Sequence, residues 1–427
     1  MTQFLPRAFT LAVFLVLAGW PSFALSPYTF SVLTDREDAL YKVSDPVTFR
    51  IQLLKDGTPV TEGEIGIELG NDGSTVIKSG TRPLSVEPVI VTGTLDQPGF
   101  LRCTATFAAP DGEKVVGLGG AGLDPLNIKP SMPVPDDFDA FWAAKKAKLA
   151  EVPMNPRLTP VESTLAGVKA FDLQLDCLGG APVSGYYCMP EGAAPKSLPA
   201  TLVVHGAGVR SSILRPELAA EGLLVLDINA HGIPNGQPDE FYKNLNEGRL
   251  KNYRQHGRED RETIYFLGMY YRLMRALDFL TAQPEWDGKF LVVQGTSQGG
   301  GQSLVAAGLD PRVTAIAPGV PAMCDHSGVI NGWPRIVPRD DAGKPDPKIL
   351  EVARYYDAMN FAARTKAEAL VSVGFIDNTC RPTTVYAAYN NLQGPKKIFN
   401  MPLMGHKNAP EWDGMVLEMI KAHVGKQ

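Results

Sequence analysis

Short runs of alternating apolar and polar residues dominate the chain from Ser26 to about Gly122. The clearest runs cover residues 47–53, 66–69, 89–91 and 100–105. Turn-forming clusters such as Lys55-Asp56-Gly57 separate these runs, and the alternation puts successive side chains on opposite faces of a β-strand. Evenly spaced short strands are typical of a sandwich of two sheets. We therefore predict an N-terminal all-β, immunoglobulin-like sandwich over residues 25–125.

The hydrophobic pattern changes after this region. A glycine-rich stretch at 117–122 and a proline-rich stretch at 125–135 predict a linker. Beyond the linker, a hairpin is expected over 170–189, and near-continuous apolar runs then alternate with stretches of helical periodicity. This alternation is typical of a mostly parallel sheet with helices on both faces. We therefore predict a second, α/β domain over residues 126–427.

The strands and helices expected in this domain follow from the same pattern. The strands cover residues 200–204, 223–228, 290–294, 313–317, 369–375 and 397–400. The helices cover residues 138–152, 262–283, 300–308, 349–363, 382–392 and 412–424. Active sites in such sheets lie at the carboxyl ends of the strands. Polar residues that directly follow a strand are therefore the candidates for chemistry.

The first two dozen residues have the features of a secretory signal. Arg7 supplies a positive charge, residues 8–20 are almost wholly apolar, and Ser22-Phe23-Ala24 fits the small-residue cleavage rule. The apolar run is shorter than the roughly 20 residues that a transmembrane helix needs. We predict a cleaved signal peptide over residues 1–24 and a secreted or periplasmic protein without a membrane segment in its mature form. An uncleaved N-terminal anchor is the alternative.

Composition narrows the functional classes. The 427-residue chain has a net charge of −5, so it lacks the basic surface expected of a nucleic-acid-binding protein. Its five cysteines are an odd number, which leaves at least one unpaired, and their pairing stays open. None of them has the spacing of metal ligands. We predict no metal and no organic cofactor.

The segment Gly295–Gly299 has the pattern G-x-S-x-G. It directly follows an expected strand and directly opens an expected helix, which is the context of a nucleophile elbow in an α/β-hydrolase fold. The flanking glycines allow the tight turn that lifts the serine hydroxyl away from the sheet. Ser297 is therefore the predicted nucleophile.

A serine nucleophile needs a base and an acid. In this fold the acid and the histidine follow the serine along the chain. His423 lies in the expected terminal helix and not after a strand, which leaves His326 and His406 as candidate bases. His406 follows the last expected strand, and Asp377 ends the strand before it. We predict the triad Ser297, Asp377 and His406, with Asp325 beside His326 as the competing acid.

An acyl-transfer site also needs donors for the oxyanion. The backbone N–H of Gln298 comes with the elbow, and the N–H of Ala207, in the turn after strand 200–204, is the second candidate. His231 and Asn229 follow the next strand and are candidate substrate-binding residues, although a structural role for His231 is an equal alternative. The charged connection over 243–262, which contains Tyr253 and His256, is expected to be solvated, and a lid or rim of the pocket is the alternative.

Five blocks in the same order resemble the acetyl xylan esterase/cephalosporin C deacetylase family, carbohydrate esterase family 7. The blocks are Pro135–Trp142 (PDDFDAFW), Tyr270–Leu280, Gly295–Gly301 (GTSQGGG), Val320–Asp325 (VPAMCD) and Gly374–Thr384 (GFIDNTCRPTT). The resemblance covers about residues 130–427. It implies an α/β-hydrolase fold, the roles already given to Ser297, Asp377 and His406, and oxyanion donors at Ala207 and Gln298.

Two departures bear on specificity. Ala207 stands where the family commonly has a tyrosine that lines the pocket, and Asn229-Ala230-His231-Gly232 replaces the usual R-G-Q motif. The β-sandwich is also not part of the minimal family. The resemblance implies a homo-oligomer, unless the added sandwich blocks it.

We therefore expect a secreted serine esterase that removes acetyl or other small acyl groups from carbohydrates such as acetylated xylan. A serine peptidase of the same fold is one alternative, against which the missing propeller-sized domain argues. A carbohydrate-binding protein with an inert hydrolase domain is the other.

Overall fold

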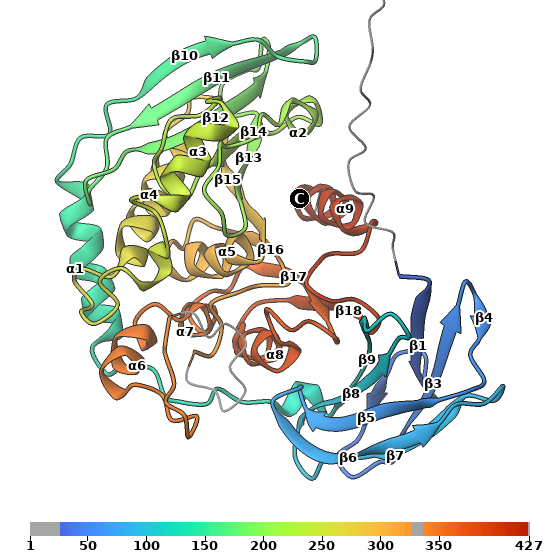
Figure 1. The fold of residues 1–427 in the computed structure, drawn as a ribbon. Helices are drawn as coiled ribbons and strands as arrows, with labels where there is room; N and C mark the ends of the chain where they lie inside the picture. The colour runs from blue at the N-terminus through green and yellow to red at the C-terminus, as the bar shows by residue number, and fades with distance from the viewer. Residues whose placement is uncertain (1–25, 327–335, 426–427) are drawn as a thin grey trace, which may run out of the picture.

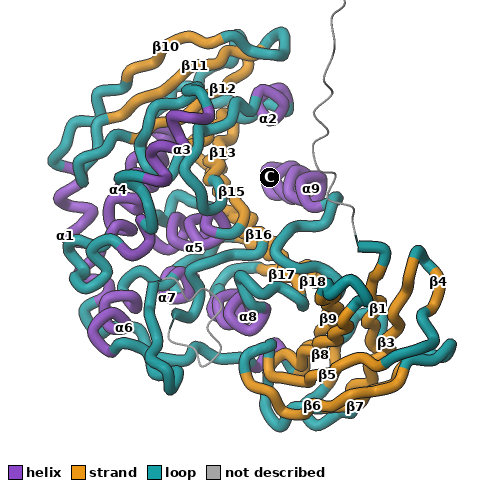
Figure 2. The backbone as a smooth tube through the Cα atoms, viewed as in Figure 1, coloured by secondary structure: helices purple, strands orange, loops and turns teal. Residues whose placement is uncertain are grey.

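The computed structural model describes residues 26–326 and 336–425, so the predicted signal peptide lies outside the described residues. A strand-rich N-terminal unit lies beside a larger α/β unit (Figure 1). Figure 2 shows that the central strands of the larger unit lie between helices. The predicted order of an all-β region followed by an α/β region is confirmed.

Two sheets form the N-terminal unit. One contains β1 (Tyr28–Thr34), β3 (Val47–Lys55), β4 (Thr58–Pro59) and β7 (Val89–Gly93). The other has the order β2 (Leu40–Tyr41), β9 (Lys114–Leu123), β8 (Gly99–Ala108), β5 (Glu64–Asn71) and β6 (Thr75–Pro83). Alternate residues of both sheets, such as Phe49, Ile51 and Leu101, share one buried core. The four runs predicted as strands lie in β3, β5, β7 and β8.

The prediction that the glycine-rich stretch 117–122 belongs to a linker is wrong, because this stretch lies within β9. β9 pairs with both β2 and β8, and its glycines admit close neighbours on both faces. A Cβ atom at Gly117 would lie 2.3 Å from the Phe30 Cβ, and one at Gly120 would lie 2.5 Å from the carbonyl oxygen of Phe375. Close packing therefore requires glycine at these positions, and the glycines do not indicate a flexible linker.

The α/β unit contains one nine-stranded sheet. Its order is β10 (Arg157–Val161), β11 (Val168–Leu175), β12 (Val183–Pro190), β14 (Leu224–Ile228), β13 (Leu198–Val204), β15 (Trp286–Thr296), β16 (Ala315–Gly319), β17 (Glu368–Gly374) and β18 (Lys396–Met401). The strands from β14 to β18 are parallel. β14 lies on one side of β13 and β15 on the other, so the connections reverse direction at β13. The carboxyl ends of β13 and β15 meet at that switch point, where ligands bind in open α/β sheets.

Helices cover both faces of this sheet. One face packs in a common core with α1 (Phe138–Ala150), α4 (Tyr265–Thr281), α5 (Gln298–Leu309), α6 (Pro347–Arg354), α7 (Ala358–Ala362) and α8 (Pro382–Asn391). The other face packs with α2 (Pro216–Ala220) and α9 (Trp412–Val424), as Figure 1 shows. Alternate strand residues divide between the two cores: Leu202 and Val293 belong to the first, and Val203 and Val292 to the second.

Among the details of this unit that differ from the prediction, two have a clear physical reason. The helix expected over 349–363 is broken into α6 and α7, because the Asp357 carboxylate caps α7 at Met359 N and also accepts the N–H groups of Asp325 and His326. β10 was not predicted. It is an exposed edge strand containing Pro160, and proline is tolerated in a sheet at such an edge.

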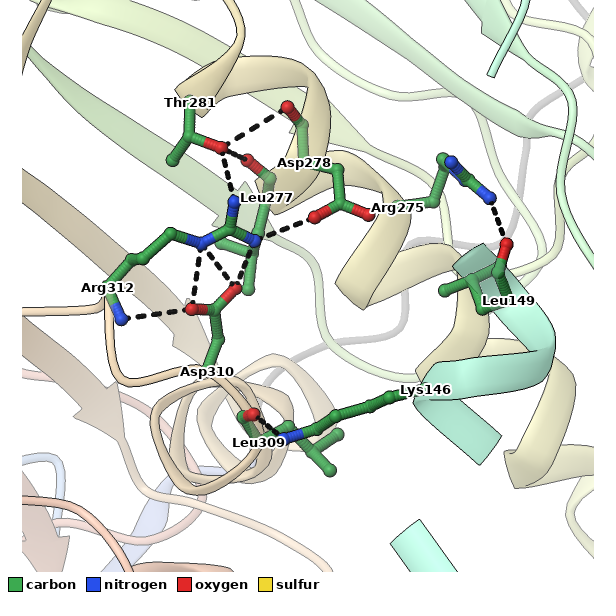
Figure 3. A network of polar contacts seen from close by, with 9 residues as sticks. All are labelled: Lys146, Leu149, Arg275, Leu277, Asp278, Thr281, Leu309, Asp310 and Arg312. Carbon is green, nitrogen blue, oxygen red and sulfur yellow. Dashed lines mark hydrogen bonds and ion pairs between the residues drawn. The ribbon is translucent and has the colours of Figure 1, made fainter. Parts of the chain in front are cut away.

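Cationic side chains join the helix ends on the side of the first core. Arg312 donates to Asp278, Asp310 and Thr281, and Lys146 donates to the Leu309 carbonyl at the end of α5 (Figure 3). Arg275 donates to the Leu149 carbonyl near the end of α1. Cations are favourable at helix carboxyl ends because the last carbonyls there lack helical partners.

Every cysteine lies within the described residues. All five are free thiols: Cys103, Cys177, Cys188, Cys324 and Cys380. Four of the five are buried, which agrees with their use as small apolar side chains.

Candidate active site

The sharp turn between β15 and α5 presents Ser297. This serine has φ 61° and ψ −119°, a backbone conformation that non-glycine residues rarely adopt. The neighbouring glycines make the turn fit, since a Cβ atom at Gly295 or Gly299 would lie 2.3 or 2.1 Å from the Val204 carbonyl oxygen. The serine itself is partly exposed. This geometry is that of a nucleophile elbow.

His406 lies between Ser297 and Asp377. Its Nε2 is 2.9 Å from Ser297 Oγ, and its Nδ1 is 2.8 Å from Asp377 Oδ2. A carboxylate accepts, so Nδ1 carries the proton, and Nε2 is left free to accept the serine hydroxyl proton. The structure therefore brings together the three predicted triad residues in the order that general-base catalysis requires.

Local hydrogen bonds orient the acid and the histidine segment. Asp377 is fully buried, and its Oδ1 accepts the backbone N–H groups of Thr379 at 2.7 Å and Cys380 at 2.9 Å. Asn408, two residues after His406, donates to the hydroxyl of Thr296, the residue before Ser297, at 3.0 Å. These contacts tie the loops after β17 and β18 to the elbow.

One predicted oxyanion donor belongs to the elbow itself, and the other to the neighbouring turn after β13. Gln298 is the first residue of α5, where the backbone N–H has no acceptor within the helix. Ala207 lies in the turn after β13, and a Cβ atom at the preceding Gly206 would be 3.5 Å from the Cβ of Ser297. The turn after β13 thus approaches Ser297, and the donor role of the Ala207 N–H stays a prediction.

His231 and Asn229 are both buried, which favours a structural role for them over the expectation that they contact substrate. His231 is 2% exposed, and its Nε2 donates to the Gly208 carbonyl while its Nδ1 accepts from the Tyr265 hydroxyl. Asn229 is fully buried and bonds to residues of its own turn. Burial lowers the pKa of His231 to about 3, so its ring is neutral. Both side chains organise loops near the site because all their polar atoms are used internally.

Tyr253 has a specific contact at the site that the sequence interpretation did not predict. It lies in a short 3-10 helix, Tyr253–Gln255, after α3 (Asp239–Glu247), within the connection predicted to be solvated. Its side chain is 3% exposed, and its hydroxyl donates to Gln298 Oε1 at 2.6 Å. This contact holds the side chain of the residue that follows Ser297. An aromatic residue among charges was the only sequence signal of this role.

The competing acid has a different position. Asp325 accepts hydrogen bonds from the backbone N–H and the hydroxyl of Ser131.

Within the described residues, one group of side chains has the spacing of metal ligands, namely Asp377, Cys380 and His406. Two of these three already bond to each other through Asp377 Oδ2 and His406 Nδ1. The arrangement favours general-base chemistry with Asp377 as the acid.

The family now follows from the comparisons with known proteins. A model of the acetyl xylan esterase family matches residues 123–422, which is well over half of the chain. The chain belongs to the acetyl xylan esterase family. It is accordingly a carboxylic ester hydrolase of the kind that acts on acetylated carbohydrates, and the resemblance stated from the five sequence blocks is confirmed.

Individual members of the family agree with this assignment. The acetyl esterase Axe7A of Xylanibacter ruminicola is 31% identical over 409 residues, which cover 93% of this chain and 91% of the relative. The solved acetyl xylan esterase from Paenibacillus sp. R4 is 29% identical with a TM-score of 0.60, covering 70% of this chain and 98% of its own. Acetyl xylan esterase 1 from Thermoanaerobacterium sp. JW/SL YS485, at 23% identity and a TM-score of 0.60, covers 70% of this chain and 97% of its own and shows the shared α/β-hydrolase fold.

The comparisons differ in how much of the β-sandwich they cover. The family match begins at residue 123, where β9 ends, so the β-sandwich lies outside it. The alignment with Axe7A is longer and extends into the sandwich.

Among residues 26–326 and 336–425, no helix is long and apolar enough to cross a membrane.

Proposed function

We propose that this acetyl xylan esterase family member is a secreted serine esterase that removes acetyl groups from xylan or xylo-oligosaccharides. The observation that carries the proposal is the continuous hydrogen-bonded chain Ser297–His406–Asp377. Family membership supports the substrate class. The signal-like pattern of residues 1–24 supports export.

In the first half-reaction, Ser297 Oγ attacks the ester carbonyl carbon while His406 Nε2 takes the hydroxyl proton. The buried carboxylate of Asp377 stabilises the imidazolium that forms. The tetrahedral intermediate then collapses, and the bond from the carbonyl carbon to the sugar oxygen breaks. His406 gives its proton to that oxygen, and the acetyl group stays on Ser297.

In the second half-reaction, water attacks the acetyl group while His406 accepts one of its protons. Acetate leaves, and Ser297 Oγ takes the proton back from His406. In both halves the oxyanion accepts hydrogen bonds from the backbone N–H groups of Gln298 and Ala207. Each such donor typically contributes about 3 kcal/mol of transition-state stabilisation. No step needs a metal or an organic cofactor.

A substrate panel with His406→Ala tests this function against the two alternatives. We expect acetylated xylo-oligosaccharide and an aryl acetate to be hydrolysed by the unaltered chain, while peptide amides are left intact. Preferential cleavage of peptide amides would support a peptidase instead. Hydrolysis should vanish in His406→Ala. Glycan binding with no hydrolysis by either chain would support the carbohydrate-binding alternative.

A further inference from the structure

The strand β8 of the sandwich presents its two faces to different cores. Leu101 and Cys103 point into the sandwich core, whereas Phe100 belongs to the core of the α/β unit. The Phe100 ring lies against Phe375, with centroids 4.9 Å apart, and against Tyr386 on α8 at 5.5 Å. Residues on the Phe100 face of β8 therefore reach the segment that follows β17.

Arg102 is on that same face, two residues from Phe100. Its side chain is 1% exposed, and its Nη2 lies 3.0 Å from the Phe375 carbonyl oxygen and 3.3 Å from that of Asp377. Its Nη1 donates to Asn378 Oδ1 at 2.6 Å. One guanidinium thus holds the backbone on both sides of the predicted acid.

A buried carboxylate fixes this guanidinium in place. Asp72, in the turn between β5 and β6, is fully buried, and its Oδ1 lies 3.0 Å from Arg102 Nη2. Its Oδ2 accepts the backbone N–H of Thr383 at 3.3 Å, and its carbonyl accepts from Arg381 at 2.8 Å. The turn of the sandwich and the chain on the far side of Asp377 are therefore joined at the same place.

The backbones also approach closely beside Arg102. Gly120 is its partner across the β8–β9 pair, and a Cβ atom at Gly120 would lie 2.5 Å from the Phe375 carbonyl oxygen. A larger side chain at this position would push the β17 end away from Arg102. The close packing at Gly120 and the hydrogen bond from Arg102 thus both fix how closely the sandwich approaches the Phe375 carbonyl.

We propose that Arg102 of the β-sandwich is a positioning residue that holds the Asp377 loop, and so the Asp377 carboxylate, against His406. This inference rests on the proposed function, in which Asp377 orients the histidine. The sandwich is then a structural part of the active site. Substitution of Arg102 should therefore change kcat equally for a small ester and for an acetylated oligosaccharide.

Arg102→Lys in the full-length chain is the main test. Lysine keeps the positive charge but lacks the planar fork that reaches Asp72, Asn378 and the two carbonyls together. Because a misplacement of about 1 Å can cost about 100-fold in rate, we expect kcat to fall tenfold or more. KM should change less than about twofold, equally for an aryl acetate and for acetylated xylo-oligosaccharide. A loss confined to KM for the oligosaccharide would overturn the inference in favour of a carbohydrate-binding role.

Arg275→Lys is the matched control. Arg275 is 5% exposed and also donates to backbone carbonyls, those of Leu149 and Val152, but it lies on α4 away from the acid loop. We expect this variant to lose thermal stability as Arg102→Lys does while kcat stays within about twofold. An equal fall of kcat in both variants would show a general effect of destabilisation and overturn the inference.

A double-mutant cycle with Asp377→Asn tests whether Arg102 acts through the acid. We expect Arg102→Lys to change kcat less than about twofold in the Asp377→Asn background. The same loss in both backgrounds would overturn the inference. If Arg102→Lys does not fold, Asn378→Ala at the exposed end of the same contact replaces it, with kcat expected to fall about threefold.

A parallel assay of Ser297→Ala keeps the two claims apart. Retained hydrolysis by Ser297→Ala would contradict the proposed function itself. An inactive Ser297→Ala together with a folded and fully active Arg102→Lys would overturn only the positioning role.

Discussion

Gly299 is the position where the structure makes its sharpest quantitative prediction. It is the second residue of α5, where alanine is normally the better helix former. In this fold, however, a Cβ atom at Gly299 would lie 2.1 Å from the Val204 carbonyl oxygen and 3.0 Å from the His205 carbonyl carbon. All of these neighbours are backbone atoms of β13 and its turn. They cannot move aside as a side chain can.

The size of the effect follows from these distances. Ordinary contact begins at 3.4 Å, so the start of α5 must move by at least about 1 Å from β13. Overpacking of this kind typically costs about 1–3 kcal/mol of stability. The same movement displaces Ser297 and the Gln298 N–H, and a misplacement of about 1 Å can cost about 100-fold in rate. We therefore expect Gly299→Ala to lower both stability and kcat.

Gly414→Ala is the control for this substitution. Gly414 lies in α9 and is exposed, and a Cβ atom there would meet no heavy atom within 4 Å. Alanine should stabilise this helix by about 0.5–1 kcal/mol without changing kcat. Urea unfolding and aryl acetate hydrolysis measure both quantities. A Gly299→Ala variant with the stability and kcat of the unaltered chain would refute the reasoning.

Three further predictions follow from the site. Asp377→Asn should lower kcat by about 10⁴-fold, since the amide favours the wrong tautomer of His406; less than a tenfold loss in aryl acetate assays would contradict this. His231→Gln should be destabilised at pH 7, and the difference from the unaltered chain should shrink by about 2 kcal/mol by pH 5. The sign follows because burial lowers the folded-state pKa of His231 to about 3, whereas the unfolded-state pKa is about 6.5. The contribution of the neutral ring to folding stability is therefore complete above about pH 6.5 and is lost as the pH falls. A constant difference in urea unfolding at the two pH values would exclude this. Tyr253→Phe should cost about 1–3 kcal/mol in urea unfolding because it removes the donor to buried Gln298 Oε1, whereas an unchanged unfolding midpoint would contradict that contact.

The proximity of Ser297, Asp377 and His406 was predictable because each residue is marked locally along the chain. The G-x-S-x-G pattern directly follows a buried strand, and Asp377 and His406 lie in the loops after the last two strands. Parallel strands bring their carboxyl ends to one edge of the sheet, so position along the chain was enough to place these side chains near one another. The contacts at 2.8 and 2.9 Å agree with that expectation.

Other features depend on contacts between distant parts of the chain. Arg102 and Asp377 are 275 residues apart, and nothing near either residue indicates that they meet. The glycine-rich part of β9 has the composition of a linker. Its glycines are there because neighbouring residues pack closely against both faces of the strand. The break at Asp357 arises from N–H groups of Asp325 and His326 in another segment. Such features follow from tertiary packing, which overrides local propensity.

The proposed serine mechanism is tested most directly by acetate release from acetylated xylo-oligosaccharide. The purified mature chain and Ser297→Ala are compared at equal concentration, with unfolding curves to show that both are folded. The account predicts steady acetate release by the unaltered chain and at least a 10⁴-fold lower rate for Ser297→Ala. Release at similar rates by both chains would contradict the assignment of Ser297 as the nucleophile.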